Sequence, residues 1–71
     1  GRGEDITPLV QPWQALTIAL ASEERAEKYF GQLAQNAPVD AVRNAARQLQ
    51  REEEEHCDLI REWLARVSPP L

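Results

Sequence analysis

The chain has 71 residues, and its twelve acidic and eight basic side chains give a net charge of −4 at pH 7. This length suits one small domain, and the single cysteine excludes an internal disulfide. The acidic balance disfavours nucleic acid as a partner, because phosphate contacts need clustered Lys and Arg. No apolar run reaches the roughly 18 residues of a membrane span. We expect a cytoplasmic protein, since no signal peptide is recognisable.

Residues 1–11 are predicted to form an extended N-terminal arm, because Gly1, Gly3 and Pro8 interrupt any regular element. A helix is predicted over residues 12–35. Pro12 suits its first turn, where the missing N–H would be unpaired in any case. The interior is rich in Ala, Leu, Glu, Arg and Lys, which favour helix.

The sequence Asn36-Ala37-Pro38 predicts a break in the helix, because Pro38 cannot continue the preceding turns. A second helix is predicted over residues 38–67, with Asp40 in its positively polarised first turn. Residues 68–71 then form a short tail, which opens with Ser-Pro-Pro. A connection this short makes the two helices antiparallel neighbours, so an all-α helical hairpin is predicted over residues 12–67.

An apolar stripe with 4-3 spacing runs along the second helix, and two of its positions are not apolar. Glu53 and His56 stand where core side chains are expected. Burying either group without a partner costs roughly several kcal/mol. A bound metal cation would satisfy both at once. The stripe consists of Val42, Ala46, Leu49, Glu53, His56, Ile60, Trp63 and Val67.

The first helix has the same rhythm, and Glu23 and Glu27 occupy its stripe between Leu20 and Phe30. Glu23 lies about 14 residues before the turn and Glu53 about 16 after it. At a rise of roughly 1.5 Å per residue, both lie about 21–24 Å from the turn. We therefore expect Glu23, Glu53 and His56 to converge, with Glu27 about one turn nearer the loop.

A two-helix hairpin cannot enclose its own stripe, whereas two hairpins related by a two-fold axis can form a four-helix bundle. The self-associated pair would present four carboxylates and two imidazoles. Oxygen donors combined with imidazole suit iron or manganese ions. A homodimer or higher homo-oligomer is therefore expected.

Two segments carry a family resemblance. Ala15-Leu16 followed by residues 23–34 resembles the first iron-binding helix of the rubrerythrin and ferritin-like family, and residues 49–56 resemble its L-x-x-E-E-x-x-H second helix. Residues 57–66 are similar to the two-helix encapsulated ferritins. The resemblance implies a ferroxidase with a di-iron centre completed across a subunit interface, and an encapsulin shell, hence a protein nanocompartment, as its surroundings.

Carried over to this chain, the resemblance makes Glu23, Glu53 and His56 the catalytic metal ligands. Glu27 matches no invariant ligand and is a further candidate, as a ligand or as an auxiliary carboxylate. Two other hypotheses stay open. The chain could be a structural metal-binding or helical dimerisation module, or an adaptor whose second half-bundle comes from another protein.

Overall fold

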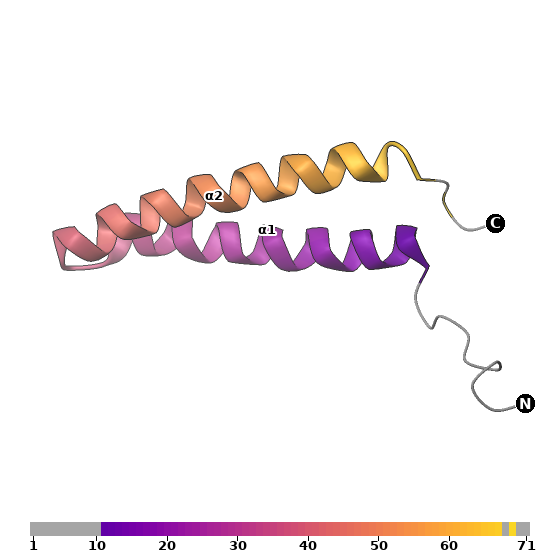
Figure 1. Ribbon diagram of the computed structural model, residues 1–71. Coiled ribbons are helices and arrows are strands. Elements are labelled where there is room, and N and C mark those ends of the chain that lie inside the picture. The colour runs from indigo at the N-terminus through magenta and orange to yellow at the C-terminus, as the bar shows by residue number, and fades with distance from the viewer. Residues whose placement is uncertain (1–10, 68, 70–71) are drawn as a thin grey trace, which may run out of the picture.

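The computed structural model describes residues 11–67 and 69, and shows two α-helices, α1 (Pro12–Asn36) and α2 (Asp40–Leu64). The helices lie side by side and run antiparallel, with the connecting loop at one end of the hairpin (Figure 1). No strand occurs among the described residues, so the predicted all-α fold is confirmed. Apart from Gln11 and Pro69, the predicted arm and tail lie outside these residues.

The N-terminus of α1 is capped by its own first turn. The Gln11 backbone N–H donates a hydrogen bond of 3.1 Å to Oε1 of Gln14, and Pro12 opens the helix. The helix ends at Asn36, where the Ala37 N–H still reaches the Leu33 carbonyl. Ala37 itself is extended, with ψ at 137°. This conformation is typical of a residue that precedes proline, because the proline ring disfavours the helical region there.

The second helix is shorter at both ends than the span of about 38–67 predicted from the sequence. Val39 is extended and caps α2, so the helix begins at Asp40 instead of residue 38. At the other end α2 stops at Leu64 instead of residue 67. There the Arg66 N–H bonds the Trp63 carbonyl, which tightens the last turn. Pro69 follows, and its ring cannot continue an α-helix.

The helix–helix contact is centred on small side chains. The buried residues with hydrophobic side chains are Ala34, Ala37, Ala46, Cys57 and Ile60. Cys57 is completely buried, although the sequence pattern placed it beside the stripe. Small residues let the two backbones approach closely, and Gly31 is packed directly against the Gln50 side chain. The axis of contact on α2 therefore runs through Ala46, Cys57 and Ile60.

The predicted stripe is only partly covered within one hairpin. Val42, Leu49, His56 and Trp63, spaced by seven residues along α2, are all exposed. Ile18 and Tyr29 are exposed on α1. The four exposed residues of α2, Val42, Leu49, His56 and Trp63, share one side of that helix, and we call them the open face. One neighbouring helix covers only one flank of a broad apolar stripe, which explains why the other flank is bare.

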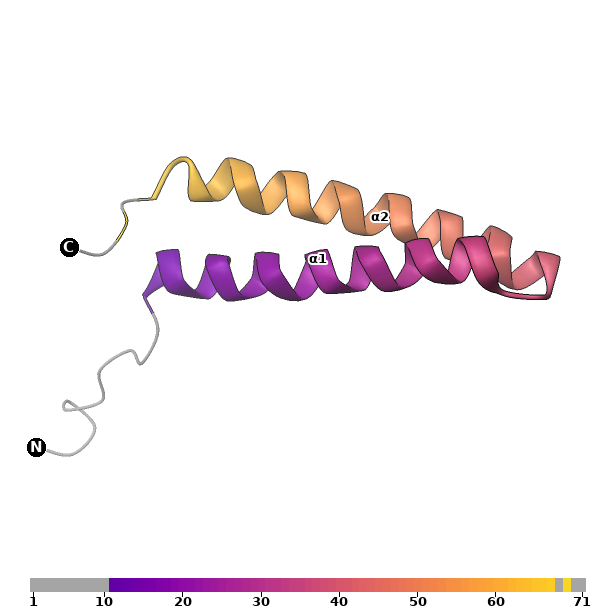
Figure 2. The ribbon, with the colours of Figure 1, turned by 180° about the vertical axis from the view of Figure 1, so that it is seen from behind.

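Figure 2 shows the hairpin from behind, again with a single layer of two helices. Within the described residues, neither helix contains an apolar stretch long enough to cross a membrane.

Candidate metal centre

Three side chains from the two helices meet near the middle of the hairpin. Nδ1 of His56 lies 3.0 Å from Oε2 of Glu23 and 3.2 Å from Oε1 of Glu53. The three residues offer one ligand atom each within a span of 4.8 Å. His56 and Glu53 share a face of α2 because they are three residues apart. The structure thus brings together the three donors that the sequence pattern predicted would converge.

The arrangement distributes protons unevenly between the two carboxyl groups. The hydrogen bond between Glu23 and Glu53, helped by His56, lowers the pKa of Glu23. The same contact with Glu23 raises the pKa of Glu53, and burial adds to this effect. The pKa of His56 is raised chiefly by its hydrogen bond to Glu23. Close like charges on the two carboxylates therefore favour a shared proton or a bound cation.

The centre is deepest at Glu53 and opens toward His56. The side chain of Glu53 is 16% exposed and that of Glu23 30%, whereas that of His56 is 54% exposed. His56 belongs to the open face, so the mouth of the donor group lies on the bare flank of the apolar stripe. Whatever covers this flank would also cover the donors.

Sequence reasoning missed a second interhelical contact. Nη2 of Arg61 lies 3.0 Å from Oε2 of Glu24, and Nη1 lies 3.2 Å from Asp58. Glu23 and Glu24 are consecutive, so they point to different sides of α1 and bond α2 on either side of the contact. The buried Cys57 lies near Arg61 and Glu24. Burial raises the pKa of its thiol, the charge of Arg61 lowers it, and that of Glu24 raises it. Counting from the turn does not predict this pair, because Glu24 lies about 13 residues before the turn and Arg61 about 24 after it.

Glu27 is not part of the three-donor group. Its carboxylate is close enough to Cys57 to raise the pKa of the thiol, second only to burial. Glu27 is half-buried, as expected for a residue on the stripe of α1. Its role as a ligand or auxiliary carboxylate stays a prediction.

A comparison with models of known protein families shows to which family the chain belongs. The Rubrerythrin family model matches residues 14–71, which is most of the chain.

The chain belongs to the rubrerythrin family.

No curated protein and no solved structure matches it. The rubrerythrin family is associated with iron binding by di-iron carboxylate sites. The matched region contains both helices and all three donors of the centre.

The donor chemistry of this rubrerythrin-family chain fits such a metal. Glu23 and Glu53 supply hard oxygen atoms and His56 an imidazole nitrogen, a combination suited to iron and manganese. Among the described residues with buried side-chain polar atoms, none lacks a hydrogen-bond partner. With one ligand atom from each residue, the three side chains would leave positions on a metal ion open to other ligands.

Proposed function

We propose that this chain is a ferroxidase-type iron-binding protein, which oxidises Fe(II) at a di-iron carboxylate centre shared between two copies. The convergence of Glu23, Glu53 and His56 beside the open face supports this proposal. Membership of the rubrerythrin family supports iron as the metal, and manganese is the second candidate.

A bound pair of iron ions would supply the redox chemistry by passing electrons from Fe(II) to oxygen or peroxide. The residues of the chain bind and orient these ions. Glu53 is the most sheltered donor and lies three residues before His56, so these two residues would hold a metal ion from one face of α2. His56 binds through one ring nitrogen and, being half-exposed, leaves the outer side of the site accessible. Binding requires neutral His56 and ionised Glu53, so protons leave the apo-centre as the metal enters.

A second copy of the chain would complete the ligand set. The donors of one hairpin open onto a bare apolar flank, and a hairpin with a bare flank is expected to associate. Two copies related by a two-fold axis would place two sets of Glu23, Glu53 and His56 around one interior. The proposed partner is therefore a second copy of the chain, and the assembly is a homodimer or a higher homo-oligomer built from such dimers. An encapsulin shell around the assembly is a further proposal, supported only by the family resemblance.

The alternative is a non-catalytic module, in which the same surface serves helical dimerisation or a structural metal site. The exposed apolar residues of the open face favour association independently of iron. The two functions are separated by iron oxidation, because a structural module would bind metal or dimerise without turning over Fe(II).

The decisive experiment adds Fe(II) aerobically to the purified protein and follows ferric absorbance. We expect oxidation faster than in a protein-free solution. Glu53→Gln and His56→Gln should reduce the rate and the Fe(II) or Mn(II) affinity, each by at least about tenfold, in line with the effect of disturbing a metal site. Glu55→Gln is a matched control, since Glu55 is exposed between the two donors in sequence but lies outside the donor group.

Equal losses in the Glu55→Gln variant would indicate a general effect of negative charge and contradict the assigned ligands. Metal uptake without accelerated oxidation would favour the structural alternative. Absence of iron and manganese uptake by the wild-type protein would overturn the proposal.

A further inference from the structure

The charged side chains of α2 are sorted by sign along the helix. Arg43, Arg47 and Arg51 lie in its first half, and an acidic stretch follows that consists of Glu52, Glu53, Glu54, Glu55 and Asp58. In an isolated helix the reverse order is favourable, because acids are stabilising near the N-terminus and bases near the C-terminus, and because a Glu placed four residues before a base makes the better pair. The stability of α2 alone therefore does not account for this order.

Four of these residues share one side of α2. Arg47, Arg51, Glu54 and Asp58 have 4-3-4 spacing, and all four are exposed. Arg47 lies nine residues, or two and a half turns, before His56, so this side is opposite the imidazole and the open face.

The first helix repeats the order on the same side of the hairpin. Arg61 bonds both Asp58 and Glu24, so the Glu24 side chain points to this side, and Lys28 follows it one turn nearer the loop. The loop half of this surface carries three positive charges and the other half three negative charges, of which Arg61 offsets one. We call this surface the charged side, and it consists of Glu24, Lys28, Arg47, Arg51, Glu54 and Asp58.

The two arginines of the charged side bond neutral groups. Arg47 donates a hydrogen bond of 2.6 Å to Oδ1 of Asn44, and Arg51 donates one of 3.1 Å to Oε1 of Gln48. A guanidinium has five N–H donors, so each arginine can bind a carboxylate in addition. Such pairs are often bidentate and are stronger than hydrogen bonds between neutral groups.

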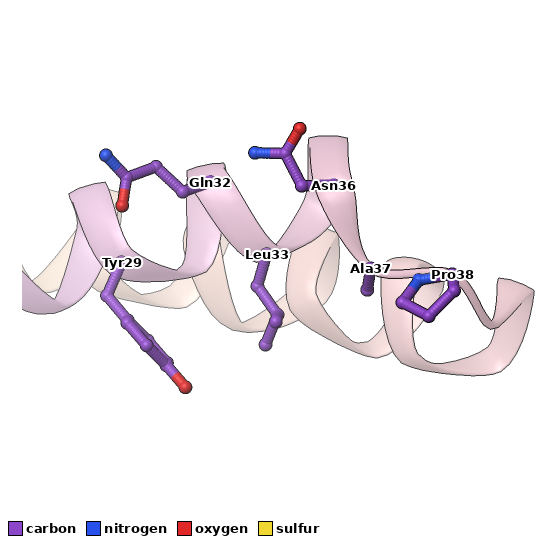
Figure 3. A pocket seen from close by; sticks show the side chains of 6 residues that line it. All are labelled: Tyr29, Gln32, Leu33, Asn36, Ala37 and Pro38. Carbon is purple, nitrogen blue, oxygen red and sulfur yellow. The ribbon is translucent and has the colours of Figure 1, made fainter.

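Polar side chains of α1 separate the charged side from an apolar region at the loop end. Figure 3 shows that Gln32 and Asn36 extend to one side of α1, whereas Tyr29 and Leu33 extend to the other. Gln32 lies four residues after Lys28 and continues its side of the helix. A partner on the charged side would therefore be recognised by charge. The cavity of about 360 Å³ at the loop end is lined by Tyr29, Gln32, Leu33, Asn36, Ala37 and Pro38.

We propose that the charged side binds the charged side of a second copy, with the basic half of each copy over the acidic half of the other. The helices are antiparallel, and the two-fold axis crosses them at right angles. About such an axis, a residue before the midpoint meets one at an equal distance beyond it. The midpoint of the four α2 residues lies between positions 52 and 53, so Arg47 faces the partner's Asp58 and Arg51 faces the partner's Glu54.

The same axis serves α1. The midpoint of Glu24 and Lys28 is position 26. Positions 26 and 52–53 both lie about three residues nearer the loop than the contact between Glu23 and His56, so they are at one height in the hairpin. Lys28 then faces the partner's Glu24. Antiparallel pairing opposes unlike charges on both helices, whereas a two-fold axis parallel to the helices would place basic half over basic half.

This contact is separate from the proposed metal centre, because none of the three donors belongs to the charged side. The inference therefore does not rest on the proposed function. Exposed ion pairs are individually weak and are screened by salt, so we expect self-association through this side at low ionic strength. A chain that pairs through both of its sides would form assemblies of more than two copies.

An exchange of charges between two variants tests the pairing. Arg47→Glu/Arg51→Glu makes the α2 part of the charged side wholly acidic, and Glu54→Lys/Asp58→Lys makes it wholly basic. Neither variant should pair with itself through this side, whereas a mixture of the two opposes unlike charges along all of α2. The acidic variant, carrying an affinity tag, is used to capture untagged proteins in the presence of a chelator. Salt is varied from about 0.01 to 1 M, where the Debye length falls from roughly 30 to 3 Å.

Glu52→Lys/Glu55→Lys is the matched control. It makes the same change of charge in the same acidic stretch, but at positions outside the charged side. Circular dichroism of each protein before mixing verifies that the helices are formed. Pairing through the side that carries the donors is common to all mixtures, so it does not contribute to a difference between them.

At low salt we expect the tagged acidic variant to capture the basic variant at several times the yield of the control and of its own untagged form, and this difference should vanish at high salt. Equal capture of the control would show that net charge alone attracts the proteins and would overturn the proposal. Equal capture of the untagged acidic variant, or no capture in any mixture, would overturn it as well. Iron oxidation is measured separately, so this proposal and the proposed function fail independently.

Discussion

Nδ1 of His56 lies 3.0 Å from Oε2 of Glu23, so an imidazole of α2 and a carboxylate of α1 join the two helices at the candidate centre. The two residues are 33 positions apart in the sequence, and their contact is a direct polar link between α1 and α2. In the apo-protein this ion pair occupies the place where a cation is proposed to bind. Protons and metal ions therefore compete for the same atoms.

The first prediction is a pH dependence of stability in the apo-protein. The pKa of His56 is raised above its ordinary 6.5, so its stabilising contribution is full below pH 6.5 and is lost as the pH rises through the higher value of the folded state. The lowered pKa of Glu23 acts at acidic pH. Its contribution to stability is full above pH 4.5 and is lost as the pH falls through the lower pKa of the folded state. Urea midpoints measured between pH 4 and 9 should fall on the alkaline side, and His56→Gln should remove that fall.

Metal affinity should change in the opposite direction over the same alkaline range, because Mn(II) needs the neutral imidazole. Calorimetric titration of Mn(II) would measure this. An affinity that is independent of pH around the titration of His56 would contradict its assignment as a ligand.

The second prediction concerns the close approach of the helices at Gly31. A Cβ added there would lie 2.8 Å from Nε2 of Gln50, the flexible end of that side chain. Gly31→Ala gains up to about 1 kcal/mol of helix propensity, and part of this is lost in displacing the amide. In a Gln50→Ala background the full gain is expected. Thermal unfolding of the four proteins of this cycle should show the melting temperature rising by roughly 4–8 °C in that background and by less in the wild-type background.

A loss of stability from Gly31→Ala in the Gln50→Ala background would mean that the backbone of α2, and not the Gln50 side chain, limits the space.

The third prediction concerns Cys57. Its thiol is fully buried and its pKa is raised by that burial, so both access and thiolate formation are suppressed. A disulfide reagent such as 5,5′-dithiobis(2-nitrobenzoate) should react with the native protein at least about a hundredfold more slowly than with the protein in urea, as opening reactions limit access. Native and denatured rates of similar size would contradict the packing of α2 through Cys57.

The fourth prediction concerns the pair formed by Arg61 and Glu24. Both side chains are half-exposed, so water screens the interhelical ion pair and its contribution to stability is expected to be small. A double-mutant cycle with Arg61→Gln and Glu24→Gln should give a small coupling that shrinks in high salt. Metal affinity should change little, because neither residue belongs to the donor group. A large loss of affinity would mean that this pair positions Glu23.

The sequence by itself determined the two helices and the height of the donors. Residue type and 4-3 spacing are local properties, and a short loop fixes the register of an antiparallel pair. Counting from the turn was therefore enough to bring Glu23, Glu53 and His56 together. The helix ends were less accurate, because Val39 takes an extended conformation that residue types alone did not indicate.

Only the tertiary structure decided which part of the apolar stripe is covered. Cys57 is completely buried, whereas Val42, Leu49 and Trp63 of the predicted stripe are exposed. The physical reason is that a broad stripe gives no information about which of its flanks the chain's own helix covers. That choice depends on how the two helices pack together around buried small residues such as Ala34 and Ala46, and the pattern of one helix does not contain this information.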